Sequence, residues 1–202
     1  DLADVKPLAQ AAAVIGREFS YRLLRQIVAG PDGLTDAALA RLEEAELIFR
    51  RGTEEEATYT FKHALVRDAA YDSLLRDRRV ELHTRLAKAL QSDASGQGGV
   101  EPEVLAHHFT AGAMWTLAVG ARRDAALRAL HRSAYAEALA HLDAALKLLV
   151  DHEHIESRQR THVEVQLSRG GALLATQGYR APATLAAFTD AHAMAVDADD
   201  SW

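Results

Sequence analysis

Apolar residues recur along this sequence at the three- and four-residue spacing of one face of an α-helix. Between residues 133 and 150, for example, Tyr135, Ala138, Leu142 and Ala145 follow this spacing, which predicts an amphipathic helix with one buried face. The hydrophobic content of 49% is ample for a core, and the aromatic content of 6% favours helices that pack closely through small residues. We predict a mainly α fold, with helices near 2–15, 21–29, 36–47, 64–90, 103–112, 116–131, 133–150, 155–176 and 182–197.

Residues 48–61 depart from helical spacing. Ile48 and Phe49, and then Tyr59 and Phe61, flank a polar turn, which indicates a β-hairpin. Three helices followed by a hairpin is the order of elements in a winged helix-turn-helix. Local signals predict where these helices begin and end, with Ser20 and Thr35 as N-caps and Gly16 and Gly30 as stops.

A stretch rich in Gly and Ser at residues 91–103 is typical of a linker. We therefore predict three parts: a winged-helix module with a trailing helix at 1–90, a flexible linker at 91–102 and helical repeats at 103–202. Residues 61–90 start like a strand and are expected to continue as one long basic helix. Its anchors under the winged module should be Leu65, Ala69, Tyr71 and Leu74.

The second part contains two segments that resemble one another. Ala138, Leu142 and Ala145 match the second helix of a tetratricopeptide repeat, with small residues where helices touch, and Phe188 and Ala191 take the places of Leu142 and Ala145. The two segments lie 46 residues apart, more than the usual period of about 34. We expect irregular repeats with lengthened helices, packed through Tyr135, Ala138, Leu142, Ala145, Phe188 and Ala191.

Composition excludes several classes of site. The chain has no cysteine, so disulfides and thiolate metal sites are impossible, and this suits a reducing cytoplasm. No apolar run approaches the roughly 20 residues of a membrane span, so we expect no membrane partner. Because the chain starts at Asp1 without Met and stops at Trp202 directly after a helical pattern, we expect it to be a fragment.

No motif for catalysis or cofactor binding is recognisable. The Gly-rich residues 95–99 lack the lysine and the preceding strand of a phosphate-binding loop. His107 and His108 are adjacent, so on a helix they point in different directions, whereas helical metal sites favour an i, i+4 spacing. We therefore predict no catalytic, cofactor or metal residues and no enzymatic activity in this chain.

Charge argues against nucleic-acid binding by the predicted winged helix. In residues 33–47, four acidic residues oppose Arg41, and the predicted wing tip adds Glu54, Glu55 and Glu56. Phosphates would be repelled from such a surface, and the net charge of −6 points the same way. The basic residues cluster instead in 76–88, where we expect them to pair with acidic neighbours or to cover apolar surface.

Several segments carry a family resemblance. "AAAVIGREFSYRLL", "YTFKHALVRDAAYDSLLRDRRVELHTRLAKAL", "PEVLAHHFTAGA", "RSAYAEALAHLDAALKLL" and "GALLATQGYRAPATLAAFTDA" resemble, in this order, the region downstream of the ATPase core in bacterial signalling ATPases of the STAND/AAA type. Those proteins often carry a class III adenylate/guanylate cyclase domain at the N-terminus and tetratricopeptide repeats at the C-terminus. The resemblance covers nearly the whole chain and is most specific in 61–90; residues 115–127 depart from it.

The resemblance implies a regulatory role without catalysis. The chain would couple the nucleotide state of an upstream ATPase domain, which would hold ATP and Mg²⁺, to a protein or peptide partner on the repeats. The residues expected to couple the two are His63, Arg67, Tyr71, Arg78, Arg79 and His83. Two alternatives stay open: a fragment of a DNA-binding winged-helix transcriptional regulator, and a stand-alone scaffold whose tetratricopeptide-like repeats bind peptides.

Overall fold

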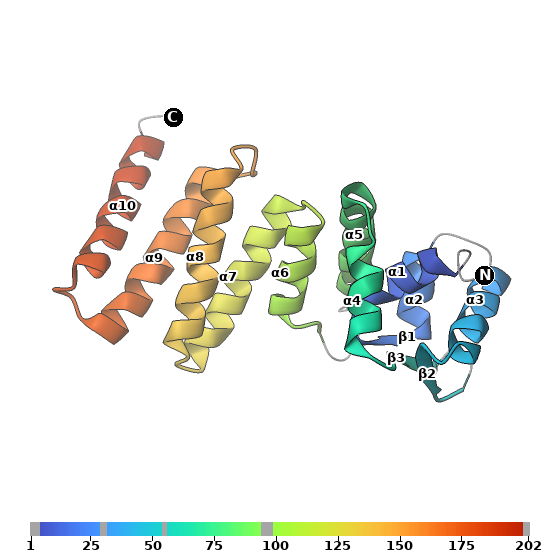
Figure 1. The fold of residues 1–202 in the computed structure, drawn as a ribbon. Helices are drawn as coiled ribbons and strands as arrows, with labels where there is room; N and C mark the ends of the chain where they lie inside the picture. The colour runs from blue at the N-terminus through green and yellow to red at the C-terminus, as the bar shows by residue number, and fades with distance from the viewer. Residues whose placement is uncertain (1–4, 29–31, 54–55, 94–98, 200–202) are drawn as a thin grey trace. The chain divides into compact units, whose positions relative to one another are not determined.

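The computed structural model describes residues 5–28, 32–53, 56–93 and 99–199. Over these residues the chain is mainly helical, with ten helices and one three-stranded antiparallel sheet, as Figure 1 shows. The chain divides into two compact units. Unit 1 comprises residues 1–99 and 111–113, and unit 2 comprises residues 100–110 and 114–202.

Unit 1 holds the sheet and the first five helices. Its elements are α1 (Lys6–Ile15), β1 (Glu18–Ser20), α2 (Tyr21–Ile27), α3 (Asp32–Glu44), β2 (Ile48–Arg51), β3 (Thr58–Phe61), α4 (Ala64–Asp72) and α5 (Arg76–Asp93). The strand order is β1-β3-β2, so the predicted hairpin of β2 and β3 gains a third strand on the far side of β3. The register places Phe19 opposite Tyr59 and Ile48 opposite Phe61.

Short-range hydrogen bonds end α1 and start α2 where the sequence predicts. The Gly16 amide donates to the Ala12 carbonyl at 3.2 Å and closes the last turn of α1. The Ser20 hydroxyl accepts from the Leu23 amide at 3.2 Å, which confirms Ser20 as the N-cap of α2. This bond satisfies one of the amides that a helix leaves without an intrahelical partner.

The core of unit 1 is aromatic at the sheet and aliphatic toward the helices. The Phe19 ring lies 5.6 Å from the rings of both Tyr59 and Phe61, measured between centroids. Each of these three residues is at most 4% exposed. Aliphatic side chains from α2, α3, β2 and α5 complete the core, namely Leu24, Ile27, Leu39, Leu42, Ile48, Leu82 and Leu86.

Four predictions for unit 1 are wrong. Strand β1 was not expected, because its three residues are too few to show alternation. Thr35 is not an N-cap, since α3 already begins at Asp32 and Thr35 is buried inside it. Residues 61–90 do not form one long helix: α4 ends at Asp72, where the Leu74 amide donates to the Tyr71 carbonyl at 3.1 Å, and α5 begins at Arg76.

The fourth error concerns the predicted anchors of α4. Leu65 is 80% exposed and Ala69 is exposed as well, whereas Tyr71 is half-buried and Leu74 is buried. The predicted stop at Gly30, the wing-tip residues Glu54 and Glu55, and residues 94–98 of the predicted linker lie outside the described residues.

Unit 2 is built from consecutive helices. They are α6 (Pro102–Ala111), α7 (Trp115–His131), α8 (Tyr135–Asp151), α9 (Arg158–Gln177) and α10 (Pro182–Asp199). From α7 onward each helix packs against the next. The turn before α8 and the residue before α9 use left-handed backbone at Ser133 and Ser157, with φ of 59° and 52°. Alanines at the contact faces of α7, among them Ala125, Ala126 and Ala129, are fully buried.

Candidate coupling site

Four of the six predicted coupling residues gather around the ring of Tyr71, and we call Arg67, Tyr71, Arg79 and His83 the Tyr71 cluster. The Tyr71 hydroxyl lies 3.0 Å from Nε2 of His83, and the two rings meet edge to face. The guanidinium carbons of Arg67 and Arg79 lie 5.5 and 4.5 Å from the centroid of the Tyr71 ring. These distances allow cation–π attraction from both.

The Tyr71 cluster joins three helices of unit 1. Arg67 on α4 donates through Nε to the Ala13 carbonyl of α1 at 3.3 Å, and its guanidinium also pairs with Asp68 at 2.7 Å. Arg79 on α5 donates to the Tyr71 carbonyl of α4 at 3.4 Å. Through these contacts α1, α4 and α5 are held to one aromatic ring.

The other two predicted coupling residues lie outside the cluster. Arg78 donates to Glu81 at 2.6 Å, one turn along α5, and this bond lowers the pKa of the Glu81 carboxyl. Arg85 pairs with the same carboxylate and also donates to the Ile27 carbonyl of α2 at 3.3 Å. His63 precedes α4 as its N-cap residue, is exposed and makes no side-chain capping bond.

Replacing Tyr71 with phenylalanine should lower the free energy of unfolding of unit 1 by about 0.5–1.5 kcal/mol, the net contribution of one hydrogen bond. Tyr71→Leu should cost more, at least about 2 kcal/mol, because the aromatic ring that attracts both guanidinium groups is lost as well. Urea unfolding followed by circular dichroism measures both. Equal losses in the two variants would show that the ring face contributes nothing beyond its hydroxyl.

The predicted repeat-packing residues divide into two groups. Ala138, Leu142, Ala145 and Ala191 are at most 2% exposed, so these four side chains are buried. Tyr135 is half-buried, and Phe188 is 38% exposed. A Cβ atom on Gly170 of α9 would lie 2.8 Å from the Phe188 ring, so the small residue at this position allows the ring to lie against α9.

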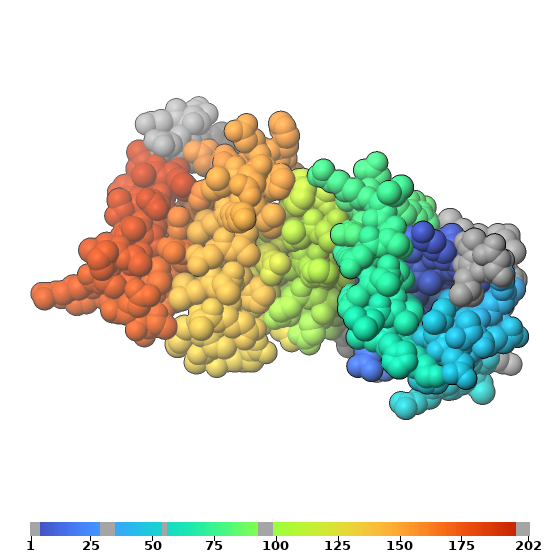
Figure 2. All heavy atoms as spheres, in the orientation of Figure 1, coloured from blue at the N-terminus to red at the C-terminus, as the bar shows by residue number. Residues whose placement is uncertain are grey.

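The last two helices keep apolar side chains at the surface. Leu185, Phe188 and Val196 of α10 are 57%, 38% and 47% exposed and line one shallow groove. Helix α10 is drawn in red in Figure 2. On α9, Leu167 and Leu174 are also exposed. Apolar stripes of this kind on neighbouring helices are typical of surfaces that contact other protein segments.

The stability of unit 2 should depend on pH through His162 on α9. Burial and the nearby Arg158 lower the pKa of its imidazole, while Asp190 on α10 acts weakly in the opposite direction. The unfolded chain therefore binds a proton more readily than the folded chain just below pH 6.5. Stability should fall as pH decreases through this window, and His162→Gln should reduce that fall in urea titrations at several pH values. If the free energy of unfolding of the variant fell with pH as steeply as that of the wild type, His162 would not be the group responsible.

A candidate cation group in unit 2 is better explained by ion pairs. Ligand atoms of Glu103, Glu137 and His141 lie within 4.8 Å of one another. The Glu137 carboxylate already accepts from Arg132 at 2.9 Å, and Nδ1 of His141 lies 3.4 Å from the Arg122 guanidinium. Two guanidinium groups oppose the binding of a further cation at this position.

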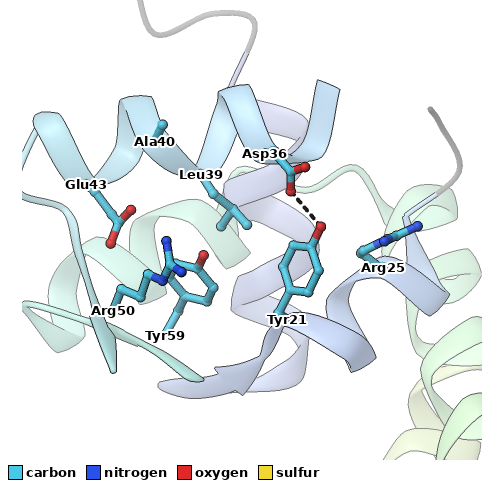
Figure 3. Close-up of a pocket in the computed structure, with 8 residues that line it drawn as sticks. All are labelled: Tyr21, Arg25, Asp36, Leu39, Ala40, Glu43, Arg50 and Tyr59. Atoms are coloured by element: carbon cyan, nitrogen blue, oxygen red, sulfur yellow. Dashed lines mark hydrogen bonds between the residues drawn. The ribbon is translucent and has the colours of Figure 1, made fainter. Parts of the chain in front are cut away.

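The sequence interpretation missed a cavity in unit 1. Figure 3 shows it between α3 and the surface formed by α2, β2 and β3; its volume is about 410 Å³. At one end the Tyr21 hydroxyl donates to Asp36 at 2.6 Å, and this bond raises the pKa of the tyrosine. Its lining residues are Tyr21, Arg25, Asp36, Leu39, Ala40, Glu43, Arg50 and Tyr59. They come from four elements, so no local sequence pattern could indicate the cavity.

Comparison with known proteins finds an uncharacterized protein, R02095, of Rhizobium meliloti (strain 1021), which is 27% identical over 179 residues. The aligned part makes up 88% of this chain and 17% of that protein, so this chain spans less than a fifth of its relative's length. No family model and no solved structure matches the chain. In the part of the chain that the structure describes, each helix is too short or too polar to cross a bilayer.

Proposed function

We propose that this chain is a non-catalytic regulatory region of a larger bacterial signalling ATPase in the cytoplasm, one of those linked to adenylate/guanylate cyclase domains. Unit 1 would be a winged-helix module and unit 2 an irregular array of tetratricopeptide-like hairpins. The element order of unit 1, helix-strand-helix-helix-strand-strand with a three-stranded antiparallel sheet, supports the first assignment. Consecutive helix packing through alanines supports the second.

The observation that carries the coupling role is the Tyr71 cluster. Its residues come from the segment with the most specific resemblance, and Arg67 extends the cluster to the Ala13 carbonyl of α1. A displacement of α1 or α4 would therefore change the contacts that hold α5 to the same ring. Such shared contacts are what coupling between two sites requires, provided that each site favours one arrangement.

The length of the relative fits a multidomain parent. The match covers most of this chain but a small part of R02095, which leaves room in that protein for several further domains. The exposed apolar stripes on α9 and α10 are the surface on which a protein or peptide partner would bind.

The coupling proposal is tested by binding the 202-residue chain to the ATPase region encoded just before it in the same reading frame. Affinity should differ between the ATP·Mg²⁺ and ADP·Mg²⁺ states, and Arg67→Gln should reduce that difference. Arg78→Gln, which changes a residue outside the cluster, serves as the control. Equal affinity in both nucleotide states, or a reading frame without an upstream ATPase, would refute the proposal.

A second test concerns catalysis by the chain itself. The isolated chain should release no phosphate from ATP in the presence of Mg²⁺. Phosphate release by the purified chain that a point substitution within it abolishes would overturn the regulatory assignment.

DNA binding is the second candidate function, because the hairpin is less acidic than its tip suggests. Arg50 and Arg51 on β2 are exposed, and Lys62 follows β3, where it pairs with Glu46. Titration of duplex DNA at several salt concentrations decides between the two functions. A steep loss of affinity with increasing salt would favour DNA binding, provided that Arg51→Gln reduces the slope of log affinity against log salt concentration by about one. The regulatory proposal predicts no such binding.

The third candidate is a peptide scaffold that works without unit 1. In that case the Leu185→Ala variant should no longer bind the partners that the full chain captures, whereas the Arg67→Gln variant should still bind them. The coupling proposal predicts that both substitutions matter.

A further inference from the structure

The cavity beneath α3 has a polar end formed by three side chains. Glu43, Arg50 and the hydroxyl of Tyr59 lie together at this end, as Figure 3 shows, away from the Tyr21–Asp36 pair. Among the described residues, no hydrogen bond or ion pair is recorded for the side chains of these three. Tyr59 is only 4% exposed, yet it lines the cavity. Its ring is buried while its hydroxyl opens onto the cavity, where it can bond to water or to a ligand.

The three groups at the polar end differ in what they can bind. The Arg50 guanidinium presents parallel N–H donors that match a carboxylate. Burial raises the pKa of Tyr59, so its hydroxyl stays protonated and can donate to the same carboxylate. Glu43 is a carboxylate and suits an ammonium group. The polar end therefore complements a ligand that carries both charges on neighbouring atoms.

The rest of the cavity combines apolar side chains with polar groups that already have partners. The guanidinium carbon of Arg25 lies 5.5 Å from the centroid of the Tyr21 ring. Leu39 is 2% exposed and lines the cavity beside Ala40 and the ring of Tyr21. Asp36 accepts the Tyr21 hydroxyl at 2.6 Å, so this carboxylate is already engaged. The volume of about 410 Å³ falls in the range of small-molecule sites, roughly 300–1,000 Å³.

We propose that this cavity binds a free α-amino acid with an apolar or aromatic side chain. The ligand carboxylate would lie on Arg50 and the Tyr59 hydroxyl, and its ammonium group on Glu43. Its side chain would lie along Leu39 and the Tyr21 ring. This site is independent of the coupling role, since it uses none of the Tyr71 cluster.

The test is an NMR titration of the ¹⁵N-labelled 202-residue chain with L-phenylalanine. The Arg50 and Tyr59 resonances should shift saturably. L-Phenylalanine amide lacks the carboxylate and N-acetyl-L-phenylalanine lacks the ammonium group. Each should bind at least about tenfold more weakly, because one charged contact is lost.

Substitutions test which side chain binds the ligand carboxylate and which binds its ammonium group. Arg50→Gln should weaken L-phenylalanine binding at least about tenfold, as should Glu43→Gln, and Tyr59→Phe should weaken it several-fold. Arg51→Gln is the matched control, since Arg51 is the next residue on β2 but does not line the cavity. Both arginines are exposed, so neither change should unfold the chain.

Three results would each overturn the proposal. One is the absence of saturable shifts with L-phenylalanine. Another is equal binding of the amide or the N-acetyl compound, which would show that only one charge is recognised. The third is an equal effect of Arg50→Gln and Arg51→Gln, which would indicate a general charge effect.

Discussion

Replacing Phe61 with alanine should lower the free energy of unfolding of unit 1 by about 3–5 kcal/mol. Phe61 is 1% exposed, and its ring lies 5.6 Å from that of Phe19, so truncation leaves a cavity where β1, β2 and β3 meet. A small domain is stable by only about 5–15 kcal/mol, so this change removes a large share. Urea unfolding followed by circular dichroism measures the loss.

Phe49→Ala is the matched control, because Phe49 belongs to the same hairpin but is 53% exposed. Nζ of Lys62 lies 5.6 Å from the centroid of the Phe49 ring. We expect Phe49→Ala to lower the free energy of unfolding by at most about 1 kcal/mol. Similar losses in Phe49→Ala and Phe61→Ala would show that the side of the hairpin facing the core has been assigned wrongly.

Leu142→Ala should destabilise unit 2 by about 2–5 kcal/mol, the usual range for a fully buried leucine. Leu142 is 0% exposed and lies at the centre of α8, which packs against both α7 and α9. Tryptophan fluorescence follows this unit through Trp115, the first residue of α7. The Trp115 ring stacks on His152 with centroids 3.8 Å apart, so its emission should change when α7 and α8 separate.

The control for Leu142→Ala is Leu185→Ala on α10, where the side chain is 57% exposed. Surface truncations of this kind change stability by about 0.5 kcal/mol or less. If Leu185→Ala proved as costly as Leu142→Ala, the groove on α10 would be covered in solution, for instance by self-association. Sedimentation at several protein concentrations would then detect the self-association, which Leu185→Ala should weaken.

The coupling proposal and the amino-acid site use different parts of unit 1. The Tyr71 cluster lies where α1, α4 and α5 meet, and the cavity lies between α3 and the sheet. Arg67→Gln should therefore weaken nucleotide-dependent coupling and leave amino-acid binding intact. Arg50→Gln should weaken amino-acid binding and leave the coupling intact. This separation lets each proposal fail without the other.

Sequence reasoning was most reliable in unit 2. There the predicted helix at 116–131 corresponds to α7 (Trp115–His131), and that at 182–197 to α10 (Pro182–Asp199). In unit 1 the same reasoning merged α4 and α5, because Leu74 continues the apolar spacing through the break. It also placed Leu65 in the core, although only its spacing, and no contact, supported that position.

By itself the sequence determined the mainly helical class, most helix positions, the hairpin of β2 and β3 and the Ser20 cap. All of these depend on residues close together in the chain, whose spacing and hydrogen bonds can be inferred locally. Only the tertiary structure decided that β1 joins the sheet, that Arg67 reaches Ala13, and that Glu43, Arg50 and Tyr59 share one cavity. Those contacts join residues far apart in the chain, and their formation depends on how whole elements pack, which no local pattern records.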